Sequence, residues 1–127
     1  MELPQISEAE WQVMEVVWQG SPITAAEIIV ELAEPTGWNH RTIRTLLNRL
    51  VRKKALSFET LANRYLYRPL VKRESYLKEE GRTFLQKMFS GDTASLVMHF
   101  VRDGRLSATE LRELKQLLAQ KQREAGK

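Results

Sequence analysis

The stretch that decides the fold is Trp38–Lys54, with the sequence WNHRTIRTLLNRLVRKK. Its apolar residues recur at the i, i+3, i+4, i+7 and i+8 positions of a helix that buries one stripe; they are Ile43, Leu46, Leu47, Leu50 and Val51. Successive helical residues turn by about 100°, so the remaining side chains project away from this stripe. The pattern predicts a helix that begins after an Asn39 cap and has one buried and one exposed face.

The predicted exposed face carries basic and hydrogen-bonding side chains, namely Arg41, Thr42, Arg44, Thr45, Asn48, Arg49 and Arg52. A helix that is merely solvated usually mixes both charge signs. Arginine can bind guanine through two hydrogen bonds, asparagine can bind adenine in the same way, and threonine can contact a base edge or the thymine methyl. This face is typical of a helix that enters a DNA major groove. The alternative is a basic surface helix that binds nothing.

Charge is distributed unevenly along the 127 residues, whose net charge is +4. Residues 1–35 hold seven acidic side chains and no lysine or arginine, a net charge of −7. Residues 36–73 hold ten lysines or arginines against Glu59, a net charge of +9. A concentrated basic segment attracts a polyanion. DNA fits better than an acidic membrane surface, because the basic helix lacks the exposed aromatic residues of an interfacial anchor.

Two short helices are predicted before the basic helix. Ser7 with Glu10, and Thr24 with Glu27, have the spacing of capping boxes, so we expect helices from Ser7 to about Gln19 and from Thr24 to about Ala33. The segment 34–37, Glu-Pro-Thr-Gly, is expected to be a turn. We interpret the N-terminal carboxylates as caps and solvated groups. Three short helices with a basic third helix are typical of a helix-turn-helix.

A two-stranded hairpin is predicted next, from the alternation of apolar and polar residues in 56–60 and 64–68. Asn63 suits the turn because it tolerates a left-handed conformation. A hairpin directly after a recognition helix is the wing of a winged helix, and Arg64 near its tip suits a DNA phosphate or the minor groove. Tyr65 and Tyr67 are assigned to the core. A solvated Arg64 is the alternative.

The last part of the chain predicts three amphipathic helices, over 74–89, 93–102 and from Ser107, with Ser107 and Glu110 as a third capping box. Their apolar faces include Leu77, Phe84, Leu85, Leu96, Phe100, Leu111, Leu114 and Leu118. So short a segment rarely encloses a core of its own, which favours a homodimer with interleaved helices. A monomer whose helices fold back is the alternative. We therefore predict a winged helix-turn-helix DNA-binding domain in residues 1–71 and a helical dimerisation region in residues 72–127.

Several classes of protein are disfavoured by composition. The chain has no cysteine and two histidines, His40 and His99, and none of the common catalytic or phosphate-loop motifs. We therefore expect no enzyme, no cofactor and no metal site. No apolar run approaches the ~18 residues of a membrane span, and the start of the chain lacks a signal-peptide pattern, so we expect a cytoplasmic protein.

A family resemblance is carried by ISEAEW at 6–11, Val13–Met14, Val17–Trp18, WNHRTIRTLLNRL at 38–50, KKAL at 53–56, RYLY at 64–67 and SLVMHF at 95–100. In these stretches the sequence resembles the penicillinase repressor family, which includes the methicillin-resistance repressor and, as a related branch, the copper-responsive repressors. The resemblance implies a mostly helical, dimeric winged-helix repressor that binds an inverted-repeat operator in double-stranded DNA. It places Arg41, Thr42 and Thr45 at positions that contact bases and backbone, and Arg64 at the wing arginine.

The resemblance also implies a release mechanism. In the β-lactam branch a membrane-bound sensor protease leads to cleavage between an asparagine and a phenylalanine in the dimerisation helices. Phe100 matches this pattern, whereas His99 stands in place of the asparagine. The copper branch ends in a cysteine-rich tail, which this sequence lacks, so copper sensing of that type is not expected. The remaining alternatives are a winged-helix regulator of another operon and a winged-helix module that binds an acidic protein.

Overall fold

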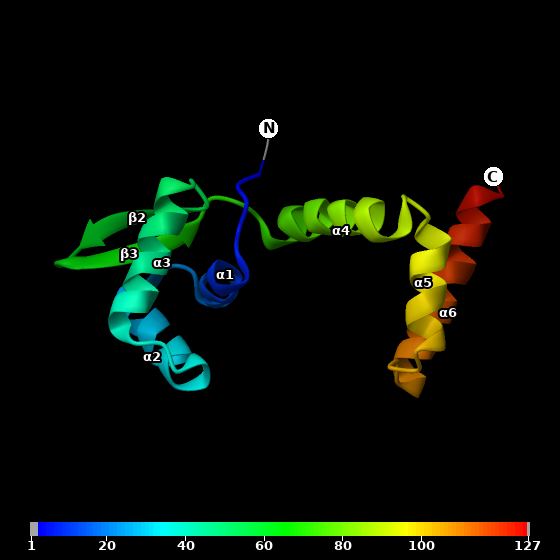
Figure 1. The fold of residues 1–127 in the computed structure, drawn as a ribbon, viewed down its shortest axis with the longest axis horizontal. Helices are drawn as coiled ribbons and strands as arrows, with labels where there is room; N and C mark the ends of the chain where they lie inside the picture. The colour runs from blue at the N-terminus through cyan, green and yellow to red at the C-terminus, as the bar shows by residue number, and fades with distance from the viewer. Residues whose placement is uncertain (1–2, 127) are drawn as a thin grey trace. The chain divides into compact units, whose positions relative to one another are not determined.

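The fold is taken from a computed structural model that describes residues 3–126; Met1, Glu2 and Lys127 lie outside the described residues. The elements follow in the order α1 (Glu8–Gly20), β1 (Ile23–Thr24), α2 (Ala25–Thr36), α3 (His40–Arg52), β2 (Leu56–Leu61), β3 (Arg64–Pro69), α4 (Arg73–Phe89), α5 (Thr93–Arg102) and α6 (Ala108–Ala125) (Figure 1). The predicted fold class, mostly helical with a small wing, is confirmed. The chain divides into two compact units between Glu80 and Gly81, inside α4. The domain boundary predicted after residue 71 stays a prediction.

The core of the first unit lies between α1, α2, α3 and the sheet. The predicted stripe of α3 is confirmed, since Ile43, Leu46, Leu47 and Leu50 are buried. They pack with apolar residues of the other elements: Val13, Met14, Val17, Ile23, Ile28, Ile29, Leu32, Ala55, Leu56 and Tyr67. The capping boxes of α1 and α2 are both present. Each box satisfies backbone N–H groups that have no partner within the helix, which explains why these helices begin where the sequence indicates.

The wing is part of a three-stranded antiparallel sheet of order β1-β3-β2, not an isolated two-stranded ribbon. Thr60 pairs with Tyr65 and Leu61 with Arg64, so the connecting turn is Ala62–Asn63. Both turn residues have positive φ, 51° and 63°, as a tight type I′ hairpin turn requires. The third strand is β1, in which Ile23 pairs with Tyr67 and Thr24 with Leu66. This strand could not be predicted from the sequence, because two residues show no periodicity.

The end of α2 differs from the prediction. The helix continues through Glu34, Pro35 and Thr36, and stops at Gly37, whose φ of 74° is left-handed and whose N–H donates to the carbonyl of Ala33. Pro35 has no N–H to donate to the carbonyl of Glu31, so this last turn lacks one helical hydrogen bond. The Thr36 hydroxyl donates to the carbonyl of Leu32 at 2.6 Å and helps to close this turn.

The assignment of Tyr65 to the core is wrong, whereas that of Tyr67 is confirmed. Tyr67 is 5% exposed and Tyr65 is 51% exposed. The two residues share one face of the hairpin, but Tyr65 lies nearer the tip, beyond the reach of the core. Its ring packs on Phe58, with ring centroids 4.8 Å apart. The apolar alternation of the strand therefore continues past the point where burial ends.

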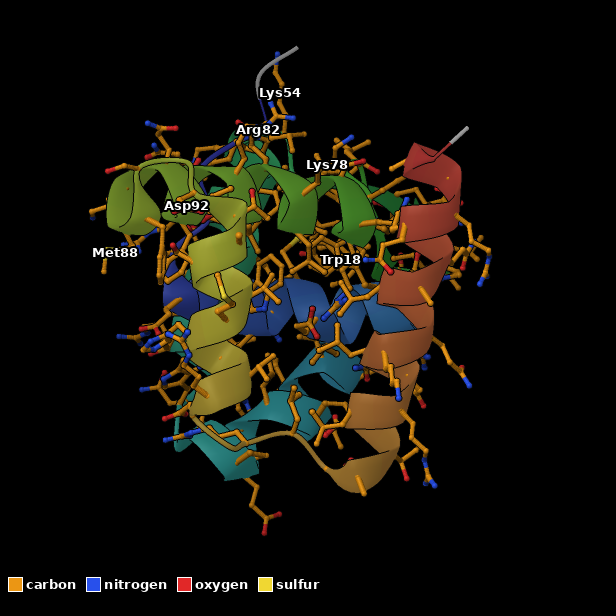
Figure 2. All side chains as sticks on the ribbon, turned by 90° about the vertical axis from the view of Figure 1, so that its right-hand side faces the viewer. Trp18, Lys54, Lys78, Arg82, Met88 and Asp92 are labelled. Carbon is orange, nitrogen blue, oxygen red and sulfur yellow. The ribbon has the colours of Figure 1, made fainter. Side chains whose placement is uncertain are left out.

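The second unit contains the end of α4 together with α5 and α6. Asp92 caps α5 by accepting a hydrogen bond from the N–H of Ser95, and Figure 2 shows it at the N-terminal end of that helix. The predicted capping box of Ser107 and Glu110 opens α6. Several large apolar side chains are exposed, including Phe84, Met88, Phe100, Leu111 and Leu118. No helix within residues 3–126 is both long enough and apolar enough to cross a membrane.

Candidate nucleic-acid interface

The outward face of α3 is the basic face predicted from the sequence. All seven predicted residues of this helix, Arg41, Thr42, Arg44, Thr45, Asn48, Arg49 and Arg52, are exposed. The Asn39 side chain caps the helix by accepting a hydrogen bond from the N–H of Thr42 at 2.8 Å. The Thr45 hydroxyl donates to the carbonyl of Arg41 at 2.9 Å, so its methyl group and a lone pair remain available to a ligand. The face thus presents cations and hydrogen-bonding groups together.

The arginines of this face are not neutralised within the molecule. Among residues 3–126, no salt bridge involves Arg41, Arg44, Arg49, Arg52 or Arg64. The acidic N-terminal third therefore does not mask the basic helix. Unpaired arginines on one surface repel one another until an anion arrives, which favours a polyanionic ligand over a purely structural role.

Arg44 and Arg64 line one cleft, although they are 20 positions apart in the sequence. The cleft has a volume of about 470 Å³ and its lining comprises Thr24, Ala25, Ala26, Glu27, Arg44, Asn63, Arg64 and Tyr65. It joins the start of α2, the exposed side of α3 and the tip of the hairpin, which projects past α3 in Figure 1. The fold thus brings the predicted wing arginine together with the predicted helix.

One carboxylate, that of Glu27, lies in this cleft. The backbone N–H and the hydroxyl of Thr24 both donate to it, and these hydrogen bonds, with the nearby charge of Arg64, hold the pKa of Glu27 below its ordinary value. The group is therefore ionised at neutral pH. Its hydrogen bonds serve the cap of α2, and among residues 3–126 it forms no salt bridge with Arg44 or Arg64.

The C-terminal end of α3 is fixed by Lys53, which follows the helix. Its Nζ donates to Oε1 of Glu10 at 2.6 Å and to the carbonyl of Gln5 at 3.0 Å. Glu10 is 1% exposed. Burial alone would raise the pKa of Glu10, but the hydrogen bonds from Lys53 and Ser7 and the charge of Lys53 outweigh it, so the pKa is lowered. Lys53 therefore attaches the basic helix to the start of α1.

This pair is not predicted from the sequence, in which Glu10 is interpreted as a cap and a solvated carboxylate. The cap is confirmed, but the solvated position is wrong. A signal was present in the sequence: Glu10, Val13, Met14 and Val17 follow the i, i+3, i+4, i+7 spacing of the buried stripe of α1. An acidic residue on such a stripe needs a cation or several hydrogen-bond donors.

Three helices with an exposed basic third helix, followed by a hairpin, define a winged helix-turn-helix protein. Comparison with known proteins identifies the family. A family model described as "Penicillinase repressor" matches residues 6–120, and the chain belongs to this family. The family is one of transcriptional repressors, which are not enzymes.

Relatives match along nearly the whole chain. A penicillinase repressor of Bacillus licheniformis is 36% identical over 116 residues, which cover 91% of each chain. A penicillinase repressor of Staphylococcus aureus is 35% identical over 114 residues, 90% of each chain. The methicillin resistance regulatory protein MecI of Mammaliicoccus sciuri is 33% identical over 117 residues, which cover 92% of this chain and 95% of MecI.

Two solved structures of a relative match more than half of the chain. The DNA-binding domain of the repressor BlaI is 39% identical with a TM-score of 0.54, covering 59% of this chain and 92% of that domain. The monomeric form of Bacillus licheniformis BlaI in complex with the blaP half-operator is also 39% identical, with a TM-score of 0.53 and the same coverage. These likenesses establish the winged-helix fold.

Proposed function

We propose that this chain is a homodimeric repressor of the β-lactam-resistance type, which binds an inverted-repeat operator through α3 and the wing. The observation that carries this proposal is the exposed face of α3, where cations without internal partners stand beside groups able to hydrogen bond to bases. The complex of the Bacillus licheniformis relative with the blaP half-operator supports DNA as the ligand. Such a protein acts in the cytoplasm, where the bacterial chromosome lies.

Each residue of the interface has a proposed role. Arg41, Thr42, Thr45, Asn48 and Arg49 face the major groove, where arginine, threonine and asparagine can read base edges. Arg44, Arg52 and Arg64 contact phosphates, which position the protein on the duplex without reading sequence. The shared cleft supports this division for Arg44 and Arg64, because it brings one arginine of the helix and one of the wing to the same place.

Fluorescence anisotropy with the blaP half-operator duplex and a scrambled duplex of equal length tests the DNA-binding role. We expect tighter binding to the half-operator and a log-linear fall in affinity with salt, because bound cations release counterions from the phosphates. Arg49→Ala should weaken binding, whereas Arg112→Ala, an exposed arginine of α6, should leave it unchanged. Equal weak binding to both duplexes would contradict the proposal and favour a module that binds an acidic protein.

The homodimer is supported by the apolar faces of the second unit. α5 and α6 line a groove of about 550 Å³ with Val97, Met98, Val101, Leu111, Leu114 and Leu118 among its lining residues. Faces of this kind are stable in water when another apolar face covers them. Leu114→Arg should shift the mass in analytical ultracentrifugation to that of a monomer, whereas Gln116→Arg on the same helix should not. An unchanged dimer in both variants would place the interface elsewhere.

Release of DNA is proposed to follow cleavage between His99 and Phe100 by a membrane-bound sensor protease. Both residues are exposed in α5, Phe100 by 50%, which supports access by a protease once the helix opens locally. Mass spectrometry of the repressor after coexpression with a β-lactam sensor protease tests this step, and His99→Asn should be cut faster than the wild type. Resistance of both proteins would favour a regulator of another operon with a different signal.

A further inference from the structure

A second cavity of the first unit lies between α1, β1 and α2, and its volume is about 540 Å³. Neither α3 nor the tip of the hairpin lines it. Its lining residues are Val16, Gln19, Gly20, Ile23, Ala26, Glu27, Val30 and Glu31. Sites for small molecules have volumes of about 300–1,000 Å³, so this one is large enough for such a ligand. We call it the α1–α2 groove.

The groove has apolar surface that the core does not use. Ile28 and Ile29 belong to the buried stripe of α2, whereas Val30 lies outside that stripe and is 76% exposed. A single exposed valine needs no explanation, but this one borders a groove whose lining also includes Ile23. A Cβ at Gly20 would lie 3.5 Å from Cδ1 of Ile23, so the glycine leaves the side chain of Ile23 open on that side.

The charge of the groove is negative. Glu27 and Glu31 are four residues apart on α2 and therefore lie on the same side of the helix, and no lysine, arginine or histidine is among the lining residues. Oε1 of Glu27 accepts the N–H and the hydroxyl of Thr24, which fixes its position. Among residues 3–126, Glu31 forms no salt bridge. Two like charges at this spacing repel each other, and a bound cation would relieve that repulsion.

The first turn of α2 separates this groove from the basic cleft described above. Glu27 lines both cavities, and the charge of Arg64 acts on it from the cleft. Glu31, one turn further along α2, lines only the groove. Glu31 is therefore the carboxylate that is most available to a cation, and the two cavities attract ligands of opposite charge.

We propose that the α1–α2 groove binds a small organic cation with an apolar body, of the alkylammonium or arylalkylammonium class. The ammonium group lies beside Glu31 and Glu27, and the apolar body covers Ile23 and Val30. A metal ion suits the groove less well, because residues 3–126 contain no group of three or more side chains able to hold one. This binding site goes beyond the proposed DNA binding and does not depend on it.

Proton–nitrogen correlation NMR of the full chain tests the inference through the shifts of backbone amides. Three ligands share the same alkyl chain and differ in charge: hexylammonium, hexanol and hexanoate. Methylammonium carries the charge without the chain. We expect saturable shifts at residues 16–31 with hexylammonium, affinities lower by about threefold or more for hexanol and methylammonium, and no saturation with hexanoate.

Variants of exposed residues identify the groups that bind. Glu31→Gln should lower the affinity for hexylammonium by about threefold, and Val30→Ser should lower the affinity for hexylammonium and hexanol alike. The matched control is Glu34→Gln, at an exposed position of α2 outside the groove, which should change neither affinity. The spectrum of each variant without ligand shows whether its fold is retained.

Four results would overturn the inference. They are equal binding of hexylammonium and hexanoate, equal effects of Glu31→Gln and Glu34→Gln, shifts concentrated at the groove between α5 and α6, and no saturable binding of hexylammonium. The last result would favour a basic protein surface as the partner of Glu31 and Val30.

Discussion

Nζ of Lys53 lies 2.6 Å from Oε1 of Glu10, a residue that is only 1% exposed. The same Glu10 oxygen accepts the N–H of Ser7 at 2.8 Å in the capping box of α1. Among the described atoms, the second oxygen, Oε2, is buried without a hydrogen-bond partner. The ionised carboxylate therefore depends on Lys53 for much of its stabilisation.

Lys53→Met should lower the free energy of unfolding by about 2–4 kcal/mol, because it leaves a buried carboxylate without its cation. Urea denaturation followed by circular dichroism at neutral pH measures this change. The matched control is Lys54→Met at the next position, where the side chain is exposed and the loss should stay within about 0.5 kcal/mol. Equal losses in the two variants would show that the charge of Lys53 is not what stabilises this end of α3.

Stability should fall in acid partly through Glu10. Its pKa is held below the ordinary value of 4.5 in the folded chain, so the contribution of its charge is present above that value and is lost as the pH falls through the lowered pKa. Comparing the wild type with Glu10→Gln by urea denaturation isolates this contribution. The other carboxyl groups whose pKa is lowered are present in both chains; they are Glu27, Asp92 and Glu110. The difference in free energy of unfolding between the two proteins should be largest at neutral pH and should become smaller in acid. A difference that does not change with pH would contradict the prediction.

Arg41→Ala should weaken operator binding by about 1–3 kcal/mol and relax sequence preference, if Arg41 reads a base in the major groove. Arg52→Ala, at a proposed phosphate contact, should weaken binding to operator and random DNA alike and reduce the salt dependence. Gel-shift titrations on both duplexes give the comparison. If Arg41→Ala lost the same affinity for operator and random DNA, Arg41 would contact the DNA backbone and not a base.

The same substitution at two glycines should have opposite effects. Gly37 ends α2 with a φ of 74°, a conformation that costs an L-residue about 1–2 kcal/mol, so Gly37→Ala should destabilise although no atom lies within 4 Å of the added Cβ. Gly81 lies inside α4, also with open space around it, so Gly81→Ala should stabilise by about 0.5–1 kcal/mol. Thermal denaturation compares the two variants, and a change of the same sign in both would contradict this account.

The sequence predicted most of the first unit because its signals are local and repeated. The stripe of Ile43, Leu46, Leu47 and Leu50 and the capping pair Ser7–Glu10 each involve residues within about two helical turns. The features that were not predicted, β1 and the pair of Glu10 with Lys53, depend on tertiary contacts between residues far apart in the sequence. β1 is a strand only because β3 lies beside it, and the cation that compensates the buried Glu10 is Lys53, 43 positions later in the sequence.

The candidate site could be predicted in part for the same reason. The exposed residues of α3 follow from helical periodicity, so each was found without the structure. The joint cleft of Arg44 and Arg64 could not be found in this way, because it depends on how the hairpin folds back beside the helix. Tyr65 shows another limit of prediction from sequence. Alternation along a strand predicts which face of the strand a residue lies on, but it does not predict where the buried core ends.

The pairing of Ile23 and Thr24 with β3 has a mechanical consequence for the wing. Thr24 is both a strand residue and the cap of α2, so a displacement of β3 pulls directly on the first turn of that helix. A wing tethered in this way resists bending as a whole, and the position of Arg64 is set by the helices to which the wing is attached.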